Sequence, residues 1–192
     1  MSKHDGHACA PETAETVLIL IDVINDFDFP EAGRLLRFAL PAARRIAHLK
    51  RRLHRKKIPA IYVNDNFGRW RSDFRAQVHR CTEENCRGTE IARLLTPTED
   101  DYFVLKPKHS GFFSTTLEVL LRKFGAKKLI VTGFAADICV LFTVFDAHMR
   151  DFKVIVPVDC TAAESKAAKI QACRQMERFA NADLRSSHLI RL

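Results

Sequence analysis

The sequence predicts an α/β fold, three-layered and Rossmann-like, in which helices cover both faces of a six-stranded parallel sheet. Short apolar runs typical of strands alternate with segments of helical periodicity nearly from end to end. This alternation is typical of parallel strands that are joined by crossover helices. The chain has 192 residues, of which 47% are hydrophobic, so it can form one compact domain. We expect a flexible tail over residues 1–15 and a single domain over residues 16–192.

Six short segments have the apolar, often β-branched character of buried strands. The first reads TVLILIDV, the second begins at a proline, and the fourth, KKLIVTG, is bounded by Gly133. In order along the chain, they span residues 16–23, 59–65, 101–107, 127–133, 152–159 and 185–192.

Four segments between these strands have apolar residues at helical spacing. The predicted helices span residues 35–56, 115–124, 138–150 and 165–181. Residues 66–97 differ, because they carry an aromatic cluster, two cysteines and two glycines, and they are predicted to form a long loop with short helices. Long excursions of this kind are commonly lids or interface elements, and the sequence leaves both possibilities open.

The formal net charge of +8 raises the question of nucleic-acid binding. Much of the basic excess lies in residues 43–57, where Ile46, Leu49 and Leu53 form an apolar seam with the charges mainly off it. A solvated helix face therefore explains the run, and no zinc-finger spacing or RNA-binding aromatic motif supports the alternative. We expect no nucleic-acid partner, although a basic surface can attract anionic substrates.

No stretch of the sequence is apolar for the roughly 18 residues that a membrane-spanning helix needs. The first residues also lack the apolar core of a signal peptide. Six scattered cysteines without CxxC pairs favour reduced thiols over a disulfide framework, and a pairing of Cys81 with Cys86 is disfavoured. We therefore expect a cytoplasmic protein without a membrane partner.

Three reactive residues follow, or end, three of the predicted strands. Asp22 lies near the end of the first strand, Lys106 at the end of the third, and Cys139 just beyond the fourth. Each alone has a simpler explanation: a buried thiol, a helix cap or a solvent-facing lysine. Because the carboxyl ends of parallel strands meet at one edge of a sheet, where ligands bind, their common placement favours a catalytic site.

The chemistry of these three groups favours a cysteine nucleophile. Cys139 is expected in the first turn of a helix, where unpaired backbone N–H groups would favour a thiolate. Asp22 can accept the thiol proton, and Lys106 can hold both anions in place. The amides of Ala135 and Cys139 are suitable donors to an oxyanion. The implied reaction is acyl transfer to sulfur, followed by hydrolysis.

Several segments of the chain resemble the isochorismatase-like cysteine hydrolase superfamily, which includes nicotinamidases and N-carbamoylsarcosine amidohydrolases. They are LILIDVINDF, YVNDNF, VLKPKHSGFFSTTLEVLL and LIVTGFAADICVLFTVFDAHMRDFKVIVPVDC, and the GxAxDxC block is the most specific. The resemblance covers about residues 17–163. It implies a six-stranded parallel sheet and a triad of Asp22, Lys106 and Cys139. It also implies a cis peptide between Phe134 and Ala135, and an oxyanion hole from the amides of Ala135 and Cys139.

The chain departs from the nicotinamidase pattern after the second strand. Nicotinamidases carry an Asp-x-His motif there and further histidines for a metal, whereas here Asp65 is followed by Asn66 and Phe67. A site without these imidazoles is a poor one for a transition metal. We therefore expect no metal and no organic cofactor.

The sequence leaves the substrate open. Candidates for substrate contact are Asn66, Arg69, Trp70 and His109, while Trp70 is equally suited to anchor the loop or an oligomer contact. The reading favoured by these residues is a cysteine hydrolase that cleaves a C–N bond of a small amide, carbamoyl or ureido compound. We also expect a homo-oligomer, either a dimer or a tetramer.

Two other functions remain open at this stage. One is isochorismatase-like hydrolysis of a vinyl ether, led by Asp22 as general acid with Cys139 as a bystander. The other is a non-catalytic binding or thiol-sensing protein on the same fold, or a basic surface that binds nucleic acid.

Overall fold

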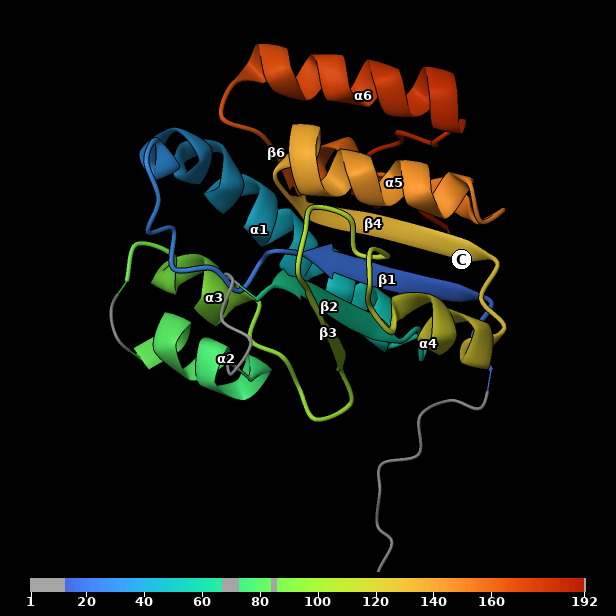
Figure 1. Ribbon diagram of the computed structural model, residues 1–192, viewed down its shortest axis with the longest axis horizontal. Coiled ribbons are helices and arrows are strands. Elements are labelled where there is room, and N and C mark those ends of the chain that lie inside the picture. Colours follow the sequence, from blue (N-terminus) through green and yellow to red (C-terminus); the bar gives the residue numbers. More distant parts are fainter. Residues whose placement is uncertain (1–12, 67–72, 84–85, 192) are drawn as a thin grey trace, which may run out of the picture.

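A parallel sheet of six strands forms the centre of the computed structural model, which describes residues 13–66, 73–83 and 86–191. Five strands lie in the order β3-β2-β1-β4-β5, and the short β6 pairs with β4 (Figure 1). Every pairing is parallel. The strands are β1 (Thr16–Ile21), β2 (Ala60–Asp65), β3 (Tyr102–Lys106), β4 (Lys128–Phe134), β5 (Lys153–Ile155) and β6 (Thr161–Ala162). The predicted fold class is confirmed, and the first five strands lie where the sequence predicts them.

The C-terminal segment differs from its prediction. The expected strand over residues 185–192 is wrong: Ser187–Leu189 forms a 3₁₀ turn, and β6 is the sixth strand. Side chains occupy the backbone groups that a sheet ladder would need. The Ser187 N–H donates to Asp159 at 2.7 Å, and the Arg52 guanidinium donates to the carbonyl oxygens of Ser187 and Ile190 at 3.1 and 2.8 Å.

Helices cover both faces of the sheet. Four helices lie close to the predicted positions: α1 (Ala32–His54), α4 (Leu117–Phe124), α5 (Leu141–His148) and α6 (Lys166–Ala180). A π-helical turn, Ala136–Val140, precedes α5 where one continuous helix was expected. The excursion after β2 contains α2 (Phe74–Glu83) and α3 (Thr89–Leu94), in agreement with the predicted short helices.

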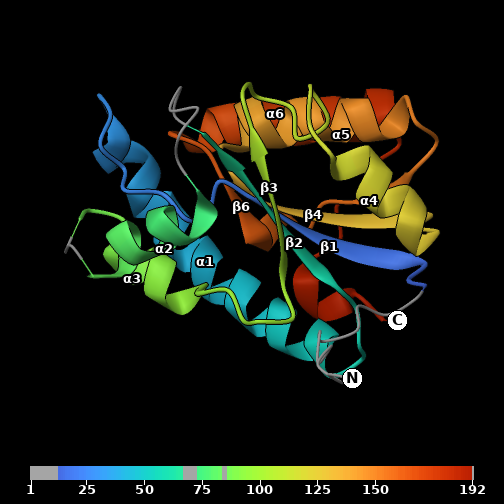
Figure 2. The same ribbon diagram turned by 60° about the horizontal axis from the view of Figure 1, so that its bottom comes forward.

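Alternation along β1 divides the core into two layers. Leu18 and Leu20 point to the layer formed with α1, α2 and α3, whereas Val17, Ile19 and Ile21 point to the layer formed with α4, α5 and α6. Figure 2 shows these two groups of helices on opposite faces of the sheet. Because both faces are covered, the central strands are buried along nearly their whole length.

The basic run of α1 lies on a helix with a buried apolar seam, as its spacing predicts. Ile46, Leu49 and Leu53 are at most 3% exposed. Several of its basic residues have intramolecular partners: Arg44 pairs with Glu90, Lys50 pairs with Asp101, and Arg52 binds the C-terminal segment. The basic side chains of this run thus mostly form contacts within the protein or face solvent.

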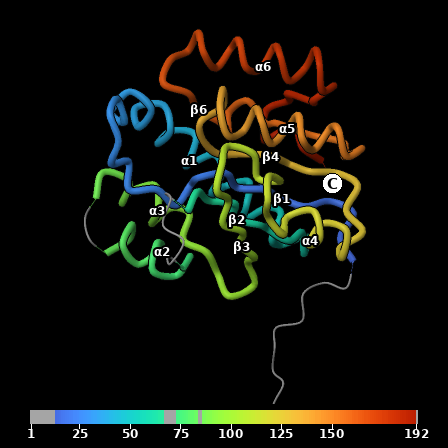
Figure 3. Tube along the Cα trace, in the orientation of Figure 1, coloured from blue at the N-terminus to red at the C-terminus, as the bar shows by residue number. Residues whose placement is uncertain are grey.

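The excursion after β2 contacts the loop that follows β1. Gln77 on α2 donates to the carbonyl oxygen of Ile24 at 2.7 Å, and Arg80 pairs with Asp26 at 2.7 Å. Figure 3 shows α2 and α3, in green, beside the edge of the sheet where β1 ends. These contacts fix the chain just beyond Asp22. None of the helices in the described part of the chain is long and apolar enough to span a membrane.

Candidate active site

The three residues that the sequence singles out lie at the carboxyl ends of three strands of the sheet. Asp22 follows directly after β1, Lys106 is the last residue of β3, and Cys139 lies in the π-helical turn after β4. Since β1 is flanked by β2 and β4, with β3 next to β2, the three residues meet at the carboxyl edge of the sheet. Single π-helical turns are frequent at functional sites.

The three side chains are in mutual contact. The Lys106 ammonium lies 2.9 Å from the Asp22 Oδ2 atom and 3.5 Å from the Cys139 Sγ atom. The Cys139 thiol is also hydrogen-bonded to the Asp22 carboxylate. The second Asp22 oxygen accepts the backbone N–H of Asp65 at 2.7 Å. The structure therefore brings together the base, the cation and the nucleophile that the strand ends predict.

Two unusual backbone conformations shape this edge of the sheet. Asp22 has a φ of 50°, and Gly133 has a φ of 112°. A Cβ at residue 133 would lie 2.1 Å from the carbonyl oxygen of Ile21, so only glycine allows β1 and β4 to approach this closely. The cis peptide between Phe134 and Ala135 that the family resemblance implies is present.

Burial and the close charged neighbours together set the protonation of the site. It raises the pKa of the Asp22 carboxyl, although Lys106 opposes this shift. It also works to lower the pKa of Lys106, but Asp22 and Cys139 more than offset it, so the pKa of this ammonium lies above its usual 10.5. Lys106 is 0% exposed and remains charged.

The expectation that the helix terminus favours a thiolate at Cys139 is wrong for the resting site. Burial, with the Asp22 carboxylate adding to it, raises the pKa of the Cys139 thiol well above its usual 9.0. Lys106 opposes this shift without overcoming it. The direction of this shift favours a neutral Cys139 thiol, and the Asp22 carboxylate that contacts it is a group that could accept its proton.

A fourth ionisable residue, Asp65, belongs to the cluster and is not among the predicted site residues. Its Oδ2 atom lies 3.4 Å from the Lys106 ammonium. The signal was available in the sequence, because Asp65 ends the second predicted strand, and β2 aligns it with Lys106 across the ladder.

The structure places the predicted substrate-contacting residues in different surroundings. Asn66 is buried, and its N–H donates to the Lys106 carbonyl oxygen at 3.0 Å, so it lies beside the triad. His109 is exposed in the loop after β3 and stacks on Phe142, with ring centroids 5.6 Å apart. Arg69 and Trp70 lie outside the described residues.

The amide candidates for the oxyanion hole belong to the turn after β4. The Ala135 carbonyl oxygen accepts the N–H groups of Ile138 and Val140 at 3.2 and 3.1 Å. The Thr143 hydroxyl donates to the Cys139 carbonyl oxygen at 2.7 Å and accepts the N–H of Gly111 at 3.0 Å. The turn that carries Cys139 is thereby attached both to α5 and to the loop after Lys106.

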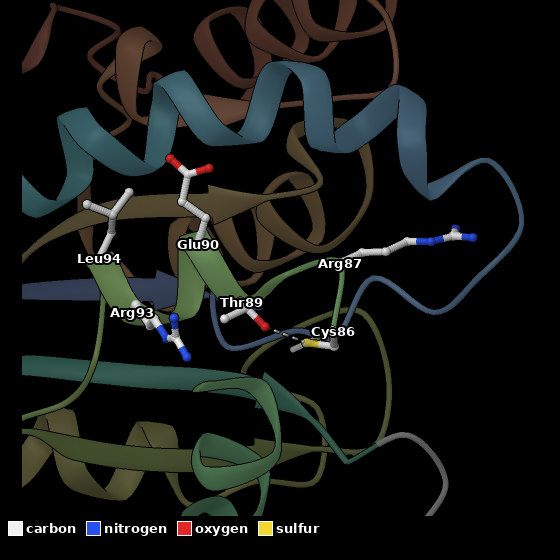
Figure 4. Close-up of a pocket in the computed structure, with 6 residues that line it drawn as sticks. All are labelled: Cys86, Arg87, Thr89, Glu90, Arg93 and Leu94. Atoms are coloured by element: carbon white, nitrogen blue, oxygen red, sulfur yellow. Dashed lines mark hydrogen bonds between the residues drawn. The ribbon is translucent and has the colours of Figure 1, made fainter. Parts of the chain in front are cut away.

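A cavity of about 520 Å³ lies along α3, apart from the triad (Figure 4). Figure 4 shows the Thr89 hydroxyl directed at the Cys86 sulfur, at 3.5 Å. The cavity is lined by Cys86, Arg87, Thr89, Glu90, Arg93 and Leu94. The five cysteines among the described residues are free thiols. Within the same residues, no three His, Cys, Asp or Glu side chains are grouped so that they could hold a metal ion.

Comparisons with known proteins agree on one family. Residues 16–185 match the family model described as the isochorismatase domain. The chain is 35% identical over 177 residues to an uncharacterized isochorismatase family protein, YaaI, of Bacillus subtilis, covering 92% of this chain and 97% of that protein. It is 33% identical over 162 residues to a probable inactive nicotinamidase of Arabidopsis thaliana, covering 77% and 81% of the two chains.

Among solved structures, the N-carbamoylsarcosine amidase of Thermoplasma acidophilum superimposes with a TM-score of 0.71 at 26% sequence identity. The match covers 93% of this chain and 99% of that one. The similarity therefore extends over nearly the whole length of both chains.

Proposed function

Because the chain belongs to the isochorismatase family of hydrolases, we propose that it is a cysteine hydrolase that cleaves a C–N bond in a small amide, carbamoyl or ureido compound. The observation that carries this proposal is the contact of the Lys106 ammonium with both the Asp22 carboxylate and the Cys139 sulfur. The structural similarity to an N-carbamoylsarcosine amidase supports the substrate class.

In the first half of the reaction, the Cys139 sulfur attacks the substrate carbonyl carbon while its proton passes to Asp22. The amides of Ala135 and Cys139 are the proposed donors to the oxyanion that forms. Asp22 then gives the proton to the nitrogen of the leaving group, the C–N bond breaks, and a thioester remains on Cys139.

In the second half, water attacks the thioester carbonyl carbon. Asp22 accepts a proton from this water, the carbon–sulfur bond breaks, and the sulfur takes a proton back. The products are an amine or ammonia and the corresponding acid. Lys106 stays charged throughout and stabilises Asp22 when it is ionised, as well as the sulfur when it carries negative charge.

Substrate contacts are proposed for Asn66, Arg69, Trp70 and His109. Asn66 supports this role through its position beside Lys106, and His109 presents its ring at the surface against Phe142. Arg69 and Trp70 follow Asn66 by a few residues in sequence.

Intact-protein mass spectrometry tests the proposal directly. The enzyme is mixed with a panel of small amides, carbamoyl compounds and ureas, and is quenched in acid over milliseconds to minutes. For a true substrate, we expect a transient increase in mass equal to the acyl group, which disappears as substrate is consumed. Substrate that is consumed without any adduct, and equally fast by Cys139→Ala, would favour direct hydrolysis led by Asp22 and would exclude the thioester route.

A further inference from the structure

The Lys106 ammonium is shared by more groups than the proposed reaction uses. It lies 2.9 Å from Asp22, 3.4 Å from Asp65 and 3.5 Å from the Cys139 sulfur. One cation thus serves two carboxylates and a thiol. The proposed reaction assigns a role to Asp22 and to Cys139 but none to Asp65.

Asp65 is fixed in this position from two sides. Its backbone N–H donates to Asp22 Oδ1 at 2.7 Å, while its own carboxylate contacts Lys106. The ladder between β2 and β3 aligns Asp65 with Lys106, and the next residue, Asn66, donates its N–H to the Lys106 carbonyl oxygen at 3.0 Å. The end of β2 is therefore attached to both the base and the cation of the triad.

The effect of a second carboxylate follows from charge. Lys106 is completely buried, so its interactions with nearby charges are only weakly screened by solvent. An ammonium alone beside Asp22 and Cys139 would favour a carboxylate and a thiolate together. A second carboxylate beside the same ammonium cancels part of the positive field of Lys106. The Asp22 carboxyl and the Cys139 thiol then both hold a proton more firmly.

We propose, on the basis of the hydrolase function proposed above, that Asp65 is a positioning residue whose carboxylate offsets the charge of Lys106 and keeps Cys139 protonated until Asp22 removes its proton. The transfer moves one proton from sulfur to a carboxylate oxygen and leaves the net charge of the cluster unchanged. Asp65 thereby keeps Asp22 basic enough to act as the acceptor. In the resting enzyme the Cys139 thiol stays neutral, and it loses its proton only as the sulfur attacks the substrate.

The ionisable groups that bear on the Cys139 sulfur are few among the described residues. Asp22, after β1, and Lys106, at the end of β3, act on it directly. Asp65, at the end of β2, contacts the same Lys106 ammonium at 3.4 Å. A change of charge at residue 65 therefore alters the field that Lys106 presents to the thiol.

The test is the pH dependence of Cys139 alkylation by iodoacetamide, followed on the peptide that contains Cys139. Only the thiolate reacts, so the midpoint of the profile reports the ionisation of the cluster. Asp65→Asn leaves Lys106 with fewer counter-charges, and the midpoint is expected to move to lower pH by about half a unit to one unit. The shift is moderate because the Asp65 side chain is 31% exposed.

Three further variants make the result specific. Asp65→Glu keeps the charge and should retain the wild-type midpoint, whereas Asp65→Ser removes it and should repeat the shift if Asp65→Asn does not fold. Asp101→Asn is the matched control, because Asp101 also pairs with a lysine but lies at the other end of β3, and it should change nothing. Coincident profiles for wild type and Asp65→Asn, or equal shifts for Asp65→Asn and Asp65→Glu, would overturn the inference.

This measurement requires no substrate, so it separates the inference from the proposed function. If no amide gives an acyl adduct but the Asp65→Asn profile shifts, the proposed reaction is wrong and the role of Asp65 in the cluster stands. If adducts form and the profile does not shift, the reaction stands and Asp65 has no such role.

Discussion

Replacing Cys139 by alanine is expected to lower kcat/KM for a C–N substrate by at least about 10⁴-fold, because the atom that forms the covalent bond is lost. The fold should tolerate the change, since Cys139 is only partly buried and its backbone contacts do not involve the sulfur. The measurement is steady-state turnover of whichever compound forms an adduct with the wild-type enzyme, together with a thermal unfolding curve.

The same variant separates the proposal from ether hydrolysis led by Asp22. If Asp22 acts alone as a general acid, the sulfur is a bystander and Cys139→Ala keeps its turnover. Cys86→Ala is a suitable control, because this thiol is also partly buried but lines the cavity along α3. Loss of activity in both variants would mean that cysteine removal disturbs the protein in general.

Replacing Gly133 by alanine is expected to reduce the free energy of unfolding by roughly 4 kcal/mol. The backbone at this position has a φ of 112°, which a residue with a Cβ rarely adopts. The added carbon would also lie 2.1 Å from the Ile21 carbonyl oxygen and 2.7 Å from its nitrogen. Urea denaturation followed by circular dichroism measures this loss.

Gly33→Ala is the matched control for this substitution. Gly33 lies in the first turn of α1, and a Cβ there would meet nothing within 4 Å. This variant should be as stable as the wild type, or more stable by about 0.5–1 kcal/mol, because alanine favours a helix. If Gly133→Ala proved equally stable, β1 and β4 could not be as close beside Asp22 as the structure places them.

The sequence allows most of the sheet to be predicted, because its strands are buried on both faces and appear as nearly continuous apolar runs. The alternation of strands with helices then orders the layers. From these two patterns alone, Asp22, Lys106 and Cys139 can be placed at one edge. Their contact distances in the structure, 2.9 and 3.5 Å from the lysine ammonium, confirm that they meet.

Local sequence pattern predicts the wrong conformation for the C-terminal segment, because side chains distant in sequence decide its conformation. Residues 185–191 have strand-like composition, but Arg52 and Asp159 take up backbone groups of this segment from other parts of the chain. The two residues of β6 are too short a run to stand out as a strand. The contacts of Arg52 and Asp159 with residues 185–191 cannot be inferred from the sequence of that segment.

The protonation of the site residues and the contact of Asp65 with Lys106 also could not be predicted from local sequence pattern. The position of Cys139 beside a helix start suggests a thiolate, yet its protonation follows from burial and from Asp22, which is distant in sequence. Asp65 is visible as a strand end, but its contact with Lys106 depends on the register between β2 and β3. Such effects require the arrangement of several elements at once.

The central claim is that Asp22, Lys106 and Cys139 act as one unit, and a double-mutant cycle tests it most directly. The measured quantity is kcat/KM for Asp22→Asn, for Lys106→Met and for the double variant, with folding checked by thermal unfolding. We expect each single change to cost about 10³-fold, and the double variant to be nearly as active as the slower single variant. Losses that multiply in the double variant would show that the two residues act independently, and would contradict the account.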